Sequence, residues 1–510
     1  MNATKLLIDT NILIALEDPG SIDPVVAEFS RRCHDEGVVI HVHQATLADF
    51  ERDNDASRRE ASKTRHAKFP SLDHIPKPSF ADLQSAYGPI KNANDLVDVE
   101  LLHALAVNAV DLLVTQDGDL HRRVRGTDME GRVLTVSDVV AWLRSLQDSE
   151  NANLPHVEDV KAYALDANDD IFKSLALSYP GFCDWWDNKC ARQHRSCWVV
   201  GHKAGRMDGL VVRKRESGQE IGLTKGSSVL KLCTFKVADH AQGTKIGELL
   251  LKKAIWYAQS NRYDAIYLTT FPVQTMLIDL MTRYGFEVAD KLENGELLLV
   301  KMMHRAQLIV EGRRDAAQVR RDYPRFSIAP PVGLFVIPIR WRYFTQLFPE
   351  AATIPPLPLF PEASSLATVE AGTAGNTIRK VYISRSKIQS LCPGDVLVFY
   401  LSKDKSASYS QCLTTVGTVE SVRRASDFRE LSRLVAGRSA YSQEDLAGIF
   451  NDGDDLTVID FLLVGHLSKP VPIAELLRER ILSAPPQSIS RLGERAGSLL
   501  KPIMRFGFEL

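Results

Sequence analysis

Four acidic side chains stand at the ends of strand-like segments or on the helix-like segments that follow them in the first third of the sequence: Asp9, Asp49, Asp98 and Asp117. Carboxylates gathered in one place repel one another and stay ionised only if a cation neutralises them. Hard oxygen ligands favour Mg²⁺ or Mn²⁺, and a pair of such ions can activate water for phosphodiester cleavage. The four acids therefore predict a divalent-metal site with hydrolytic chemistry, which needs no histidine.

A parallel sheet would position these acids. Asp9 directly follows a short apolar strand, 5–8, Asp117 follows a second one, 111–114, and the expected helix 98–110 carries an acid in its first turn. Strands that alternate with helices favour a parallel sheet, whose ligands bind beyond the carboxyl ends of the strands. The acids are therefore expected to meet at one edge of an α/β sheet.

This arrangement, over residues 1–148, resembles the PIN domain of metal-dependent ribonucleases. The resemblance implies that the family's four catalytic acids and metal ligands match, in chain order, Asp9, Asp49, Asp98 and Asp117. Asp49 is one methylene shorter than the glutamate usual in the family, and Glu51 on the same expected helix, 46–52, is the alternative ligand. The implied cofactor is Mg²⁺ or Mn²⁺.

A basic run closely follows Asp117. Its arginines, Arg122, Arg123 and Arg125, are placed where they could hold the phosphates of RNA beside the metal site. Taken singly, each acid or cation is explained as well by a helix cap or a solvated charge. It is their combination that favours a site directed at nucleic acid.

A second candidate site lies near the middle of the chain. Residues 231–237 alternate apolar and polar side chains, as a strand with one buried face does, and a helix is expected after the turn 241–247. The start of a helix carries unpaired backbone N–H groups and the positive end of the helix dipole. The segment 242–247 is therefore a candidate site for a phosphate or pyrophosphate group.

The elements that follow, a strand over 264–270 and a helix over 276–284, give an order that resembles the GCN5-related N-acetyltransferase (GNAT) fold. The resemblance implies acetyl-CoA as a cofactor, bound by Val237, Gln242, Gly243, Thr244, Lys245 and Gly247. Lys245 stands where the family usually has glycine. The family's frequent general-acid tyrosine falls on Met281, and Tyr284 is out of register, so the resemblance supplies no catalytic acid.

Residues 311–510 read as a β-rich module. The stretch 387–402 followed by 412–422 resembles ASCH and EVE domains, relatives of the PUA fold that form small barrels and bind RNA or modified bases. Arg340 and Arg342 alternate with two aromatic residues and could form a stacking surface for a nucleotide. A barrel rim packed on a neighbouring domain is the alternative interpretation of this segment.

The chain as a whole has 510 residues, of which 25% are charged, and a formal net charge of −2, so nucleic-acid contacts must come from local patches. The seven cysteines contain no C-x-x-C pair, which favours a reducing, cytoplasmic location. We find no signal-peptide pattern and no apolar run of the roughly 18 residues that a membrane span needs.

These patterns predict a multidomain α/β and α+β fold with a PIN-like domain, 1–148, a GNAT-like domain, 149–310, and a PUA-like barrel domain, 311–510. A helix over 157–179 is expected to open the second domain. The first functional interpretation is a metal-dependent ribonuclease directed at RNA, with tRNA as the first candidate, joined to an acetyl-CoA-binding domain. A toxin-like role would require an antitoxin protein as partner.

Two alternatives stay open from the sequence. One is an N-acetyltransferase that acts on a protein or a small amine, with a non-catalytic PIN-like domain. The other is a non-catalytic regulator that senses acetyl-CoA and binds RNA. The oligomeric state also stays open.

Overall fold

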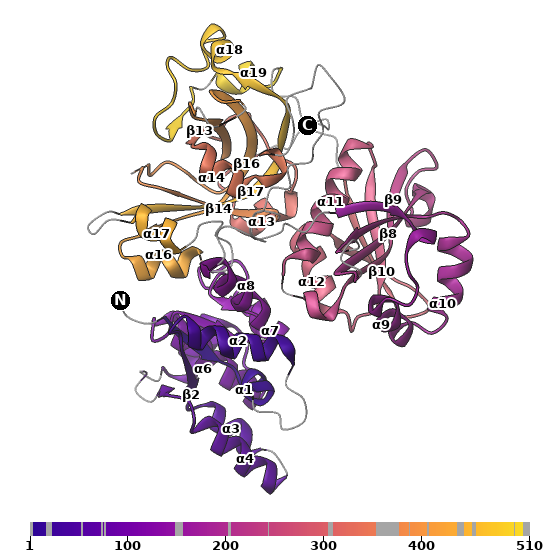
Figure 1. The fold of residues 1–510 in the computed structure, drawn as a ribbon, viewed down its shortest axis with the longest axis vertical. Helices are drawn as coiled ribbons and strands as arrows, with labels where there is room; N and C mark the ends of the chain where they lie inside the picture. The colour runs from indigo at the N-terminus through magenta and orange to yellow at the C-terminus, as the bar shows by residue number, and fades with distance from the viewer. Residues whose placement is uncertain are drawn as a thin grey trace. The chain divides into compact units, whose positions relative to one another are not determined.

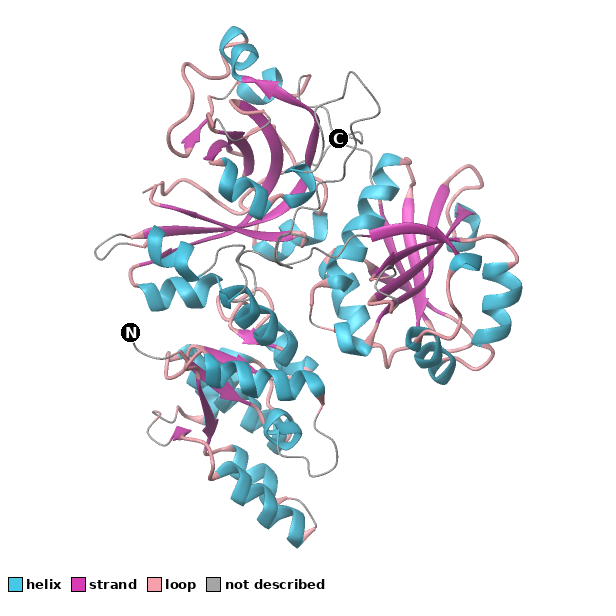
Figure 2. Ribbon diagram, viewed as in Figure 1, coloured by secondary structure: helices cyan, strands magenta, loops and turns pink. Residues whose placement is uncertain are grey.

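The structure is a computed structural model, drawn in Figures 1 and 2. It describes residues 4–16, 23–52, 55–72, 75, 78–147, 157–201, 206–242, 244–303, 310–352, 377–386, 388–404, 407, 409–435, 443–450, 455–493 and 495–502. The chain divides into two compact units. Unit 1 comprises Met1–Asp148 and Ala425–Asp454, and unit 2 comprises Ser149–Arg424 and Asp455–Leu510. One parallel and two mixed sheets confirm the expected multidomain fold class.

Unit 1 is built on a parallel sheet with the order β3-β2-β1-β4-β5. Its strands are β1 (Lys5–Ile8), β2 (Val39–His43), β3 (Ser71–Leu72), β4 (Leu112–Val114) and β5 (Val133–Leu134). Leu6 and Ile8 of the central strand pack into one apolar cluster and Leu7 into another, so both faces of β1 are covered. The sheet extends from β1 to β2 on one side and to β4 on the other. The carboxyl ends of β1 and β4 therefore flank a switch point, where such sheets bind ligands.

The helices of unit 1 are α1 (Thr10–Leu16), α2 (Pro24–Asp35), α3 (Thr46–Glu51), α4 (Ala56–His66), α5 (Phe80–Tyr87), α6 (Ala93–Ala106), α7 (Gly118–Arg123), α8 (Val136–Gln147), α16 (Phe428–Val435) and α17 (Gln443–Ile449). Helix α6 begins before Asp98, because the side chain of Asn92 caps it by accepting the backbone N–H of Asp95 at 2.9 Å. Asp98 lies in the second turn, so the prediction that it belongs to the first turn is wrong.

Helices α16 and α17 join unit 1 from far along the chain. The guanidinium of Arg429 on α16 donates to both carboxylate oxygens of Asp111, at 2.7 and 3.0 Å. Asp111 precedes β4 and is buried, and it also accepts the backbone N–H of Lys5 at 2.8 Å. This stretch of the expected third domain therefore packs with the N-terminal sheet.

Unit 2 contains a seven-stranded sheet with the order β11-β12-β10-β9-β8-β7-β6. Its strands are β6 (Val157–Lys161), β7 (Ser196–Val200), β8 (Gly209–Ser217), β9 (Ser228–Val237), β10 (Ala265–Thr270), β11 (Glu287–Lys291) and β12 (Leu297–Met302). β9 and β10 run parallel, and the other neighbours are antiparallel. The predicted strand before the turn 241–247 is thereby confirmed as the end of β9.

The helical segments beside this sheet are η1 (Ala162–Ala164), α9 (Asp170–Ser178), α10 (Phe182–Trp185), η2 (Trp186–Ala191), η4 (Gly218–Ile221), η5 (Asp239–Ala241), α11 (Ile246–Ser260) and α12 (Thr275–Arg283). Figure 1 shows α11 beside β8 and β9. A Cβ on Gly209 would come within 2.7 Å of Ile246 and 2.9 Å of Leu250, so the glycine lets α11 approach β8 closely. The helix predicted over 157–179 is wrong in its first part, because Val157–Lys161 pairs with β7 as an edge strand.

The second sheet of unit 2 has the order β14-β17-β16-β15-β13-β18. Its strands are β13 (Leu334–Ile339), β14 (Arg379–Ser384), β15 (Val396–Leu401), β16 (Cys412–Ala425), β17 (Leu456–Pro472) and β18 (Ser490–Arg491). The helices beside it are α13 (Ala316–Asp322), α14 (Trp341–Leu347), α15 (Pro349–Ala352), α18 (Ile473–Arg478) and α19 (Ala496–Leu500). The predicted β-rich character of residues 311–510 is confirmed.

The two sheets of unit 2 share an apolar core. Ile378, just before β14, and Leu462 on β17 belong to the buried cluster of the seven-stranded sheet. The indole N–H of Trp256 on α11 donates to the hydroxyl of Tyr323 at 3.0 Å, and this hydroxyl donates to the carbonyl of Leu463 at 3.0 Å. Among the described helices, none combines the length and the apolar character needed to span a bilayer.

Candidate functional site

The predicted acids of unit 1 gather around the carboxyl ends of β1 and β4. Asp9 accepts hydrogen bonds of 2.6 Å from the backbone N–H of Thr10 and from Oγ1 of Thr115. Oγ1 of Thr10 in turn donates to Asp49 at 2.8 Å, and Oγ1 of Thr115 accepts the backbone N–H of Asp117 at 2.9 Å. One hydrogen-bond network therefore joins three of the four acids.

Asp98, on α6, completes this carboxylate cluster electrostatically. Burial raises the pKa of Asp98 to about 7, and three neighbouring carboxylates add to the shift, namely Asp9, Asp117 and Asp49. Burial likewise raises the pKa of Asp9, although its hydrogen bond from Thr115 opposes the change. The structure therefore brings the four predicted acids close enough to act on one another.

Neighbouring donors hold several oxygens of the carboxylate cluster. Among the described residues, no group of three or more His, Cys, Asp or Glu side chains could hold a metal ion. One oxygen of Asp49 is paired with the guanidinium of Arg52 and the other accepts from Thr10, while Asp9 also accepts Nδ2 of Asn11 at 2.6 Å. Carboxylate oxygens suit Mg²⁺ or Mn²⁺, but this arrangement does not fit either ion while Arg52 holds Asp49.

The predicted RNA-binding arginines of unit 1 differ in their surroundings. Arg122 is exposed and paired with Asp119 on the same helix. Arg123 donates to the carbonyl of Pro89 at 2.9 Å and pairs with Asp95 at 3.1 Å, so its guanidinium stabilises the fold. Arg125 is half-buried. The run is therefore not a uniform cationic surface.

The second candidate site forms where β9 and β10 part. In the described residues the two strands share three register positions, the last of which pairs Lys231 with Tyr267. Beyond this pair β9 continues to Val237 while it stays paired with β8. The side chains over 233–237 are half-buried. A wedge therefore opens between β9 and β10, and one edge of β9 lines it.

The loop after β9 enters α11 through a left-handed residue. Lys245 has φ +65°, a conformation that glycine usually supplies, and its side chain makes no capping hydrogen bond to the helix. Gln242 is exposed, and its amide donates to Asp239 at 3.0 Å. Thr244 donates to a backbone carbonyl of the loop at 2.6 Å, and Gly243 lies outside the described residues. In the described part of this loop, the side chain of Lys245 therefore does not cap the first turn of α11.

Val237 and Gly247 bring the end of β9 against the start of α11. A Cβ on Gly247 would lie 3.3 Å from Leu280 on α12 and 3.7 Å from Val237. The glycine therefore permits a close approach of two helices and a strand at this point. This packing fixes where the uncapped turn of α11 stands relative to the wedge.

Helix α12 offers no exposed tyrosine to this wedge. Met281 and Tyr284 are both fully buried, and the hydroxyl of Tyr284 donates to Glu248 at 3.0 Å. Neither side chain is therefore exposed to the wedge.

The sequence did not predict a row of polar side chains across β8, β9 and β10. Lys214 lies opposite Lys231, which lies opposite Tyr267. The hydroxyl of Tyr267 donates to Glu216, and Nζ of Lys214 donates to the same carboxylate at 2.7 Å. Burial alone would raise the pKa of Glu216, but these hydrogen bonds and the charge of Lys231 lower it. An ionised carboxylate therefore lies at the vertex of the wedge.

The predicted cations of the second sheet lie at the start of α14. Arg340 and Arg342 are both exposed, and the guanidinium of Arg342 lies 5.9 Å from the ring centre of Tyr343. Trp341 packs on Phe344, with ring centres 5.9 Å apart. The aromatic residues of this segment are therefore engaged with their neighbours, while both arginines reach solvent.

Comparisons with known proteins give matches to structures and none to sequences. No protein-family model matches the chain, and no curated protein matches it. An ASCH protein from Zymomonas mobilis matches with 16% identity and a TM-score of 0.24, over 34% of this chain and 96% of its own.

Two acetyltransferases also match, each over 29% of this chain and 99% of its own. NAA60 from Arabidopsis thaliana in complex with acetyl-CoA has 15% identity and a TM-score of 0.23. The IAA acetyltransferase from Bacillus cereus has 18% identity and a TM-score of 0.22.

Proposed function

We propose that unit 2 binds an acyl-CoA and transfers its acyl group to an amine. The observation that carries the proposal is the wedge between β9 and β10, which leads into the left-handed turn at Lys245 and the uncapped start of α11. An extended chain that bears amides can pair with the open edge of a strand. A pyrophosphate suits the N–H groups and the positive dipole of a helix start. CoA carries both groups in one molecule.

The residues of the loop have separate roles in this proposal. The backbone N–H groups of Lys245 and of the first turn of α11 would meet the pyrophosphate, and the Lys245 ammonium adds positive charge. Gly247 keeps this turn close to Val237, and Gln242 brings an exposed amide. The bound acyl-CoA supplies the activated thioester. The chain holds and orients that thioester beside the polar vertex formed by Glu216.

The proposal is tested by isothermal titration of the full chain with acetyl-CoA. Lys245→Pro should weaken binding at least about tenfold, since proline cannot adopt a positive φ and lacks the N–H group. Lys245→Gly is the matched control, because glycine keeps both the N–H and the left-handed backbone. Retention of full affinity by the proline variant would refute the proposed loop.

Transfer is measured separately, as release of free CoA in the presence of a peptide amine, a polyamine or tRNA. Acyl transfer to one of them that depends on Lys245 supports the enzyme. Tight acetyl-CoA binding with no transfer to any acceptor would favour a regulator that senses acetyl-CoA and binds RNA through its second sheet.

A second candidate function is metal-dependent cleavage of RNA by unit 1. The observation that favours it is the network that joins Asp9, Asp49 and Asp117 at the switch point of the parallel sheet. Cleavage of tRNA that requires Mn²⁺ and is lost in Asp9→Asn would support it. Arg52→Ala should then increase the affinity for Mn²⁺, because it releases Asp49. No Mn²⁺ binding by either protein would leave the network as a structural feature of the fold.

A further inference from the structure

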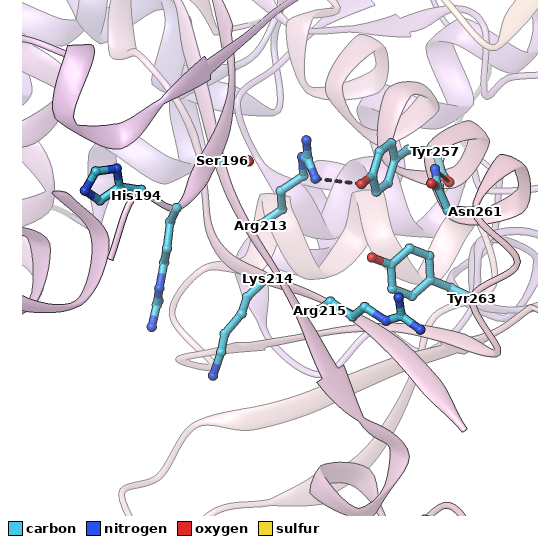
Figure 3. A pocket seen from close by; sticks show the side chains of 9 residues that line it. His194, Ser196, Arg213, Lys214, Arg215, Tyr257, Asn261 and Tyr263 are labelled. Atoms are coloured by element: carbon cyan, nitrogen blue, oxygen red, sulfur yellow. Dashed lines mark hydrogen bonds between the residues drawn. The ribbon is translucent and has the colours of Figure 1, made fainter. Parts of the chain in front are cut away.

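A pocket of about 410 Å³ lies in unit 2 beside the C-terminal end of α11 (Figure 3). The last pair of β7 and β8 joins Ser196 to Arg213, so β8 extends beyond its neighbour at Lys214 and Arg215. Tyr257 of α11 also lines the pocket. Helix α11 has 15 residues. At about 1.5 Å per residue, the pocket lies roughly 20 Å from the loop at the start of this helix.

The pocket is rich in positive charge. Four of its lining residues carry a full cation, namely Arg195, Arg213, Lys214 and Arg215. Arg213 pairs with Asp159 at 2.7 Å and Lys214 with Glu216 at 2.7 Å. In the part of the chain that the structure describes, neither Arg195 nor Arg215 has a carboxylate partner, so the pocket keeps an excess of positive charge.

Two of the guanidinium groups are held by aromatic rings. Arg213 lies 4.3 Å from the ring centre of Tyr257 and donates to its hydroxyl at 2.8 Å, and Arg215 lies 6.0 Å from the ring centre of Tyr263. Figure 3 shows both arginines pointing toward these tyrosines. The ring contacts fix the guanidinium groups before any ligand arrives, which lowers the entropic cost of binding.

Nε of Arg195 and Nε of Arg213 are buried and have no hydrogen-bond partner in the described structure. Both atoms are covered by the protein, so a ligand in the pocket would not be bound through Nε of either residue. The Arg195 guanidinium donates to the sulfur atoms of Cys233 and Cys190, at 3.6 and 3.9 Å, which are weak acceptors.

We infer that this pocket binds a small molecule through a phosphate monoester or pyrophosphate group. Guanidinium forks match phosphate oxygens in geometry, and a group with two or more negative charges balances the excess of cations around the pocket. The pocket volume falls in the range of small-ligand sites. Because guanidinium groups lie against Tyr257 and Tyr263, the phosphate and not a stacked base is the recognised part.

The test is isothermal titration of the full chain with pyrophosphate, with inorganic phosphate and with a single-stranded RNA oligomer at low ionic strength. Arg215 is exposed, so Arg215→Ala should fold normally and weaken pyrophosphate binding by about tenfold or more. Lys291→Ala, on the exposed edge strand β11, removes an equal charge elsewhere and should leave the affinity unchanged. Stronger binding of pyrophosphate than of phosphate identifies a diphosphate ligand, and the reverse order identifies a monoester.

Three results would overturn the inference. The first is pyrophosphate binding that is abolished by Lys245→Pro and unchanged by Arg215→Ala, because this result would place the anion at the start of α11. The second is an equal loss in the Lys291→Ala control, which would indicate nonspecific charge. The third is tight RNA binding that depends on Arg215 in the absence of any pyrophosphate binding. Because acetyl-CoA affinity is measured separately, failure here is distinguishable from failure of the acyl-donor site.

Discussion

The hydroxyl of Tyr284 donates a hydrogen bond of 3.0 Å to Oε1 of Glu248, in the first turn of α11. The same oxygen accepts the backbone N–H of Arg379 at 2.9 Å. Burial raises the pKa of Tyr284 well above its usual value, and the charge of Glu248 adds to the shift. This tyrosine therefore links α12 to α11 and is not suited to deliver a proton to a bound substrate.

Replacing Tyr284 by phenylalanine tests this structural role. Tyr284→Phe should lower the free energy of unfolding by about 1 kcal/mol, because one hydrogen bond is lost and Glu248 keeps another. Any acyl transfer should change less than about twofold, because the hydroxyl of Tyr284 is buried and is not expected to contact the transition state. A tenfold change would require the loss of about 1.4 kcal/mol of transition-state binding. Denaturant titration and CoA release report the two effects. A hundredfold fall in transfer with unchanged stability would instead make Tyr284 a catalytic residue.

Arg429 should be needed for the stability of unit 1. Arg429→Ala leaves the buried carboxylate of Asp111 without its guanidinium partner, which should cost about 3 kcal/mol. Arg433→Ala is the control, because it removes one exposed hydrogen bond to Asn108 and should cost about 0.5 kcal/mol. Hydrogen–deuterium exchange of β1 measures both. Equal protection in the two variants would contradict the assignment of α16 to unit 1.

Lys301 gives unit 2 a pH dependence on the alkaline side. Its side chain is buried on β12, and burial lowers the pKa of Lys301 to about 7 from 10.5. Between these values the unfolded chain binds a proton that the folded chain has released, so the free energy of unfolding should rise with pH over this window. Below pH 7 both states are charged and the penalty is constant.

Lys301→Met should therefore stabilise unit 2 at pH 7, by about 1 kcal/mol or more, and flatten the rise between pH 7 and pH 10. Urea titration at a series of pH values measures the slope. Lys291→Met, on the exposed strand β11, should keep the slope of the parent protein. A parent protein whose stability is already flat across this range would show that Lys301 is not a buried cation.

Asp98 gives unit 1 the opposite dependence. Because its folded pKa is raised to about 7 from 3.8, the folded chain holds a proton that the unfolded chain has lost between these values. The contribution of Asp98 to stability is therefore complete below pH 3.8 and is lost as the pH rises to 7. Asp98→Asn should remove this fall and make unit 1 more stable at pH 8. Exchange rates of β1 amides that are the same in both proteins at pH 8 would argue against a buried, repelled carboxylate.

Local patterns made much of the fold predictable. The alternation over 231–237 and the apolar periodicity after Gly247 identified β9 and α11, because both patterns involve only residues that are close together in the chain. The sequence Val157–Lys161 spaces its two valines as one face of a helix does. It forms a strand only because the open edge of β7 pairs with it, which no local pattern reveals.

Long-range pairing decided the rest of the candidate sites. The four predicted acids do gather, and their meeting depends on the pairing of β1 with β4; the ion pair of Asp49 with Arg52, by contrast, joins residues three positions apart. The hydrogen bond of Glu216 with Tyr267 needs the cross-strand register of β8, β9 and β10, and the bridge between Asp111 and Arg429 joins residues more than 300 positions apart in the chain.

The most direct test of the acyl-donor site is a crystal structure of the full chain with acetyl-CoA. We expect the pyrophosphate within hydrogen-bonding distance of the backbone N–H groups of Lys245 and Gly247, and the amide-bearing arm in the wedge beyond the pair Lys231–Tyr267. Acetyl-CoA bound at the Arg215 pocket instead, or a wedge closed by side chains of β9 and β10 at saturating acetyl-CoA, would contradict it.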